Sequence, residues 1–157
     1  MQKYIVYVLV AIIGTGIAVS AIANDVELQQ RLMAMKVAAV EKMYQQDVST
    51  EGMNDPMVLR QYSDPELKAA FQLADDYFDR EQLNCGIDYD VLWDSQDPDY
   101  SQNKQFAVTE QGLVKVSLAQ GSTIYYELSC DDDVCQIADV VLTKNISLKS
   151  HLLNSCQ

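Results

Sequence analysis

The clearest structural signal in the chain is KQFAVTEQGLVKVSLAQGSTIYYELSC, residues 104–130. In its middle, Val114, Val116 and Leu118 alternate with polar or small neighbours, as residues do in a strand that is buried on one face. Glutamine-glycine pairs on both sides of this strand favour tight turns. We therefore predict an antiparallel meander. Its strands are expected over residues 104–110, 113–119, 122–130 and 134–142.

The sequence before the meander shows helical spacing instead. Over residues 25–47, apolar side chains recur at steps of three and four, which predicts an amphipathic helix with a broad buried face. A short helix is expected over residues 57–62. The apolar residues of the first helix are Leu28, Leu32, Met33, Met35, Val37, Ala39, Val40, Met43 and Tyr44.

A further helix has clear start signals. Asp64 is a suitable N-cap, Pro65 fits the first helical position, and Gly86 is the expected terminator. A last short helix is predicted over residues 147–154. Helices that precede an antiparallel meander point to an α+β domain rather than to a doubly wound parallel sheet.

The N-terminus has the pattern of an export signal. Lys3 precedes an apolar run over residues 4–19, and Ala21 and Ala23 give the small-x-small motif that signal peptidase accepts. We predict a signal peptide over residues 1–23, cleaved after Ala23, and a periplasmic or secreted protein. The alternative is an uncleaved membrane anchor, because the apolar run approaches the roughly 20 residues that span a bilayer.

The mature chain is expected to comprise an N-terminal helix, residues 24–50, and one α+β domain, residues 51–157. The full chain has 11 basic and 23 acidic residues and a net charge of −12. Cleavage removes Lys3 and no acid, which leaves −13. This charge argues against nucleic acid and against anionic membranes as partners. A basic protein fits better, although the same charge also serves solubility.

Four cysteines remain in the mature chain, and in an exported protein an even number indicates disulfides. Cys130 and Cys135 are separated by four residues, which suits a bridge across the end of a hairpin and leaves Cys85 with Cys156. The other two connectivities remain open. A zinc site that combines thiols with His151 is the alternative, but it requires reduced cysteines. We read His151 itself as a residue at the surface or at a helix end.

Three phrases carry a resemblance to a known family: LRQYSDPELKAAF, IDYDVLWDSQD and CQIADVVL with SLKSHLL. In this order they resemble the exported bacterial family catalogued as domain of unknown function 3828, whose cone-shaped fold is like that of nuclear transport factor 2. The similarity covers residues 57–153. It implies a curved sheet wrapped around helices, a pocket at the wide end and pairing through the sheets. Cys135 and Gln136 depart from the family, which tends to carry a tryptophan there.

The block DYDVLWDSQDPDY, residues 88–100, is the densest polar stretch. One interpretation is structural, with Trp93 packed inward and the aspartates capping turns. Another is a contact surface for a basic protein, since aromatic residues beside acids suit interfaces. A third is a catalytic acid pair, Asp94 and Asp97, of which one would have to be buried. The candidate binding residues are Asp88, Asp90, Trp93, Asp94, Asp97 and Tyr100.

We expect no metal and no cofactor, because the acidic block lacks the central glycine and terminal glutamate of a calcium loop. The sequence favours a non-enzymatic binding module, such as an inhibitor or immunity protein against a basic, cell-wall-active protein. The alternatives are a small-ligand-binding or envelope-maintenance domain that uses a cone pocket, and an enzyme of the ketosteroid-isomerase type. The stretch CDDDVC is interpreted as a disulfide-clipped turn whose tip, Asp131 to Asp133, is solvated.

Overall fold

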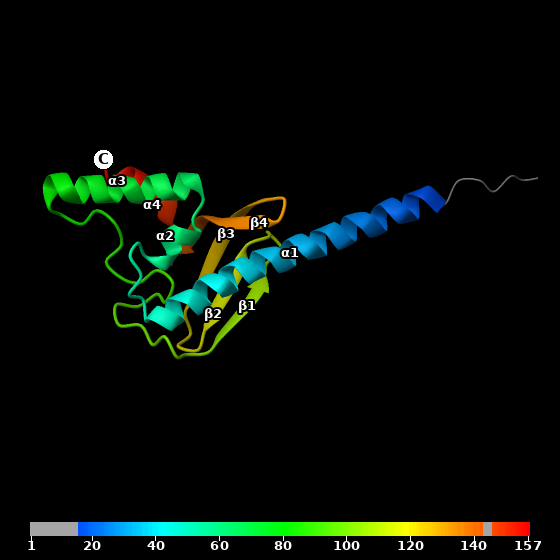
Figure 1. Cartoon of the computed structure of the whole chain (residues 1–157), viewed down its shortest axis with the longest axis horizontal. Helices are drawn as coiled ribbons and strands as arrows, with labels where there is room; N and C mark the ends of the chain where they lie inside the picture. The colour runs from blue at the N-terminus through cyan, green and yellow to red at the C-terminus, as the bar shows by residue number, and fades with distance from the viewer. Residues whose placement is uncertain (1–15, 143–145) are drawn as a thin grey trace, which may run out of the picture. The chain divides into compact units, whose positions relative to one another are not determined.

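Figure 1 shows a computed structural model of the chain. The structure describes residues 16–142 and 146–157. The chain divides into two compact units, Met1–Arg31 and Leu32–Gln157. Most of the expected signal peptide, residues 1–15, lies outside the described residues, so its cleavage stays a prediction. Helices at the N-terminal side, an antiparallel sheet and a short C-terminal helix confirm the α+β class.

Helix α1, Gly16–Thr50, is 35 residues long and extends past the predicted residues 25–47 at both ends. The side chains of residues 24–31 are all exposed. The predicted broad buried face is therefore wrong for Leu28 and Met33, because an apolar stripe is buried only where other elements pack against it. Among the side chains of α1 that the structure describes, residues 24–50, the fully buried apolar ones are Val40, Met43 and Tyr44.

The predicted four-stranded antiparallel meander is confirmed, and a two-residue fifth strand that was not predicted extends the sheet to the order β1-β2-β3-β4-β5. In β2, burial alternates as the sequence predicts, with every second residue facing the core. Most strands differ from their predicted bounds by one or two residues, because the chain enters turns there. The strands are β1 Lys104–Val108, β2 Val114–Leu118, β3 Thr123–Asp131, β4 Val134–Leu142 and β5 Ile146–Ser147.

Three further helices complete the second unit: α2 Val58–Tyr62, α3 Pro65–Glu81 and α4 Leu148–Ser155. The Asp64 side chain accepts a hydrogen bond from the Leu67 N–H, as expected of an N-cap. The expected stop at Gly86 is wrong. Helix α3 ends at Glu81, where Gln82 takes the left-handed conformation with φ 55° and its N–H donates to the Phe78 carbonyl.

The core of the second unit combines side chains from the C-terminal part of α1, from α2, α3 and α4 (Figure 1), from the segment after α3 and from the sheet. Tyr44 of α1 reaches the sheet, where its hydroxyl lies 2.8 Å from the hydroxyl of Tyr126 in β3. Helices α3 and α4 contact each other and β4. Residues 32–50 belong to the same compact unit as the rest of the chain up to Gln157, and the domain boundary expected at residue 50 stays a prediction.

Both disulfides have the connectivity that the sequence favours. Cys130 and Cys135 are direct partners in the β3–β4 register, with Cα atoms 4.0 Å apart, and the tip between them is exposed. Cys85 is bonded to Cys156, which ties the segment after α3 to the end of α4.

Within the described part of the chain, none of the helices combines the length and the hydropathy that crossing a bilayer requires.

Candidate functional site

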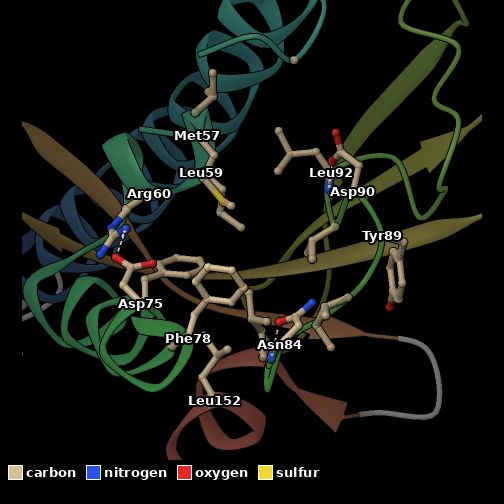
Figure 2. A pocket seen from close by; sticks show the side chains of 18 of the residues that line it. Met57, Leu59, Arg60, Asp75, Phe78, Asn84, Tyr89, Asp90, Leu92 and Leu152 are labelled. Atoms are coloured by element: carbon tan, nitrogen blue, oxygen red, sulfur yellow. Dashed lines mark hydrogen bonds and ion pairs between the residues drawn. The ribbon is translucent and has the colours of Figure 1, made fainter. Parts of the chain in front are cut away.

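A cavity of about 590 Å³ lies among α2, α3, α4 and the segment that follows α3 (Figure 2). Its lining residues come from the four helices, from the segment between α1 and α2 and from the segment that follows α3, and none of them belongs to a strand. The pocket at the wide end of a cone, which the family resemblance implies, stays a prediction. The face of the sheet toward α1 is filled by side chains, including those of Tyr44, Trp93 and Tyr126.

The walls of the cavity are mainly apolar. Two of the wall residues, Met57 and Phe78, are more than half exposed, which marks the open side of the cavity. The deeper walls are buried. They come from α2, α3 and α4 and from the segment that follows α3. The apolar lining residues are Met57, Val58, Leu59, Phe71, Ala74, Phe78, Ile87, Val91, Leu92, Leu148 and Leu152.

The charged groups lie on two sides of this apolar space. On one side, the Arg60 guanidinium and the Asp75 carboxylate form an ion pair at 2.5 Å. Arg60 also stands 5.9 Å from the centre of the Phe71 ring. On the opposite side, Figure 2 shows Asp90 next to Leu92. A ligand in the cavity would therefore meet a neutralised pair at one side and a carboxyl group at the other.

Asp90 shares its side of the cavity with Asp47 of α1. Asp47 is 4% exposed, and its Oδ2 accepts a hydrogen bond of 2.6 Å from the Trp93 indole nitrogen. Asp90 Oδ1 accepts the Leu92 N–H at 2.9 Å. The two carboxyls are close enough to influence each other electrostatically. Both donors are uncharged, so neither aspartate has a cationic partner through these bonds.

This environment favours the protonated carboxyl group. Burial, followed by the negative charge of Asp47, raises the pKa of Asp90 to about 6, although N–H bonds from Leu92 and Trp93 act in the opposite direction. Burial likewise raises the pKa of Asp47, against the hydrogen bond from Trp93. A carboxyl group that changes charge near neutral pH in a cavity is a common feature of binding and catalytic sites.

A buried aromatic cluster supports these aspartates from the core side. The Tyr44 hydroxyl donates to the Leu92 carbonyl at 2.5 Å, which fixes the backbone beside Asp90. The rings of Tyr44 and Trp93 meet edge to face, with centroids 5.4 Å apart. Burial raises the pKa of Tyr44 well above its usual value, so its hydroxyl stays a neutral donor. The cluster therefore holds the acidic side of the cavity in place.

We expect the stability of the protein to increase as the pH falls from about 7 to about 4, in proportion to the pKa shift of Asp90. The folded-state pKa of about 6 exceeds the unfolded value of 3.8, so the folded state binds the proton more tightly. The gain is complete below the unfolded pKa and is lost as the pH rises through about 6. Partial exposure limits it to about 1–2 kcal/mol.

Urea unfolding of the natural chain and of Asp90→Asn across this pH range measures the effect. Asparagine retains an oxygen for the Leu92 N–H but cannot titrate, so the variant should lose this part of the pH dependence. Asp97→Asn removes an exposed carboxyl from the same block and is the matched control. Equal pH profiles for Asp90→Asn and the natural chain would contradict the expectation.

The candidate binding residues of the acidic block 88–100 do not form one site in the structure. Among them, only Asp90 lines the cavity. Trp93 is 0% exposed, so it belongs to the core and does not contribute to an exposed contact surface. Tyr100 packs edge to face on Trp93, with ring centroids 5.4 Å apart, and its hydroxyl lies against Gly52. Asp88 is exposed and does not line the cavity.

In the acid pair suggested for catalysis, Asp94 and Asp97, neither residue is fully buried, as one of them would have to be. Asp97 is exposed, and its N–H donates to the Ser95 hydroxyl. Asp94 is half-buried in a turn with φ 49°. Neither residue lines the cavity.

Asp47 is the important site residue that the sequence analysis missed. It follows Val40, Met43 and Tyr44 at steps of three and four, so it lies on the buried stripe of α1. An aspartate on the buried, apolar face of a helix is unusual, and this position could have identified Asp47 from the sequence. His151 also differs from the expectation, since it is half-buried and its Nε2 has no hydrogen-bond partner in the described part of the structure.

Within residues 16–142 and 146–157, the structure contains no group of three or more histidine, cysteine or acidic side chains arranged to hold a metal ion. Comparisons with family models, with curated proteins and with solved structures found no match for this chain.

Proposed function

We propose that this protein is an exported, non-enzymatic binding domain whose cavity holds a small, largely apolar ligand. The observation that carries the proposal is the cavity of about 590 Å³ with mainly apolar walls and a few charged groups at its sides. Its volume and lining are typical of small-molecule sites. The apolar walls supply affinity through burial of ligand surface, and the charged groups restrict which ligands fit.

Export is part of the same proposal. Two disulfides fit the periplasm or the extracellular space, where cysteines are oxidised. The apolar N-terminal run and the motif that ends at Ala23 support a cleaved signal peptide. The N-terminal helices and the antiparallel meander also support the proposed membership of the cone-shaped family, although the cavity lies outside the sheet.

Binding of 1-decanol, an apolar probe without charge, tests the proposal. We expect saturable binding by calorimetry and a change in the fluorescence of Trp93, the single tryptophan of the chain. Ala74→Phe places a ring in the cavity from α3 and should abolish binding. Ala107→Phe adds the same ring at an exposed position of β1 and is the matched control.

Folding of each variant is checked by circular dichroism. If Ala74→Phe does not fold, Phe78→Ala offers an independent route, because Phe78 is 51% exposed and its loss removes a wall without emptying the core. It should weaken decanol binding several-fold. Absence of saturable binding to the natural chain, or equal binding by folded cavity and control variants, would refute the proposal.

A second candidate function is binding to a basic, cell-wall-active protein, as an inhibitor or immunity protein. It is favoured by acids that the structure leaves exposed at the hairpin tip, Asp131 to Asp133, and in the block around Asp97. A basic lysozyme is a suitable probe. Its affinity should fall steeply between about 50 and 300 mM salt and on replacing the three tip aspartates with asparagine. Binding that salt leaves unchanged would count against this candidate.

A further inference from the structure

The charged lining of the cavity is mostly negative. Its charged residues are Asp47, Arg60, Asp75, Asp79 and Asp90, and the lining includes neither lysine nor histidine. Arg60 is already paired with Asp75 at 2.5 Å. A carboxylate or phosphate on a ligand would therefore have to share Arg60 with Asp75, and it would meet the other acids at close range. The cavity is unsuited to an anionic ligand.

Asp47 and Asp90 form no ion pair in the described part of the structure, and the hydrogen bonds they accept come from neutral groups, Trp93 and Leu92. Asp47 has little access to water and Asp90 is half-buried, and two such neighbouring carboxyls without a cation are costly to ionise. Without a cation, the pair lowers this cost by taking up a proton, as the raised pKa of Asp90 indicates. A cation bound beside Asp47 and Asp90 would lower the free-energy cost of their ionisation by direct charge attraction.

We infer that the ligand is a cationic amphiphile, with an apolar body that lies along the walls of the cavity and a protonated amine at the carboxyls of Asp47 and Asp90. This inference rests on the proposed binding function and specifies its ligand class. The ammonium group donates up to three hydrogen bonds, which matches carboxyl oxygens that at present share few donors. The apolar body covers the wall residues from Phe71 and Leu152 to the open side at Met57 and Phe78.

Three probes with the same ten-carbon chain test this assignment: decylamine, 1-decanol and decanoate. At about pH 7.5 the amine should bind at least about tenfold more tightly than the alcohol, because a buried charge pair contributes more than a neutral hydrogen bond. Decanoate should bind more weakly than the alcohol. Calorimetry gives the affinities, and the fluorescence of Trp93, whose indole is bonded to Asp47, reports on the site itself.

Asp90→Asn removes the charge while retaining shape, so it should reduce the preference for amine over alcohol about tenfold. Asp97→Asn, at an exposed position outside the cavity, should leave that preference as it is in the natural chain. Lowering the pH through about 6 should weaken amine binding, because Asp90 then takes up a proton. The other charged groups around the site are Asp47 on α1, Asp79 on α3 and the Arg60–Asp75 pair across the cavity. The titratable tyrosines that face Asp90 are Tyr44, Tyr89, Tyr100 and Tyr126.

The outcomes distinguish a failure of the proposed ligand-binding function from a failure of the amine assignment. If none of the probes binds, the proposed function itself fails. If decanol binds and decylamine binds no better, or if Asp90→Asn behaves like Asp97→Asn, the cavity remains a ligand site but the amine assignment is overturned. A higher affinity for decanoate would overturn it as well. A preference for amine that Asp90→Asn alone removes would establish it.

Discussion

Replacing Trp93 with alanine is expected to lower the free energy of unfolding by about 3–5 kcal/mol. Trp93 is fully buried and packs edge to face on Tyr44 and Tyr100. Its loss leaves a large void in a core that relaxes only partly. The change also removes the N–H that the buried Asp47 carboxyl accepts, so a polar group loses its partner at the same time.

Trp93→Phe separates these two contributions. Phenylalanine fills much of the space but cannot donate to Asp47, so the expected loss is about 1–3 kcal/mol. Urea unfolding followed by circular dichroism measures both variants, because Trp93 is itself the fluorescent residue. Leu83→Ala, at a side chain that is 62% exposed, is the control and should change stability by less than about 0.5 kcal/mol. A loss below about 1 kcal/mol for Trp93→Ala would show that the residue is not buried as described.

Removal of the Cys85–Cys156 disulfide is expected to have the second large effect. This bond closes a loop with a sequence separation of 71, whereas Cys130–Cys135 closes one of 5. In the chain-entropy account of disulfides, opening the long loop costs about 4 kcal/mol and opening the short one about 2 kcal/mol. The double variant Cys85→Ser and Cys156→Ser should therefore be the less stable of the two disulfide variants.

Paired serine substitutions at each disulfide, compared in urea unfolding, measure this difference. Equal losses, or a larger loss at Cys130 and Cys135, would contradict it.

The Cys85–Cys156 disulfide is also expected to affect ligand binding. It ties the segment after α3 to the end of α4, and both contribute walls to the cavity. Loss of Cys85–Cys156 should therefore weaken decanol binding, whereas loss of the hairpin disulfide should leave it nearly unchanged.

Much of the fold could be predicted because its signals are local. The alternation at Val114, Val116 and Leu118 depends only on which face of a strand meets the core, and the structure buries these residues. The N-cap at Asp64 depends on a side chain and a backbone N–H three residues apart. The hairpin disulfide joins residues five apart, so its geometry follows from the turn that they flank.

The candidate site could not be predicted in the same way. Its lining combines Asp47 of α1, Arg60 of α2, Phe78 of α3 and Leu152 of α4, which are brought together only when the helices assemble. The acidic block looked like one unit in the sequence. In the structure its members separate, with Asp90 in the cavity and Asp97 in solvent, because the turns between them reverse the chain direction.

The α+β class, the antiparallel meander and the acidic character of the protein follow from the amino-acid sequence alone. These depend on residue spacing and composition, which the chain carries whether or not it is folded. Only the tertiary structure decided where the cavity lies and which acids enter it. Burial and proximity raise the pKa of Asp90 beside Asp47, 43 positions away in the sequence, and both effects exist only after the helices have excluded water from around them.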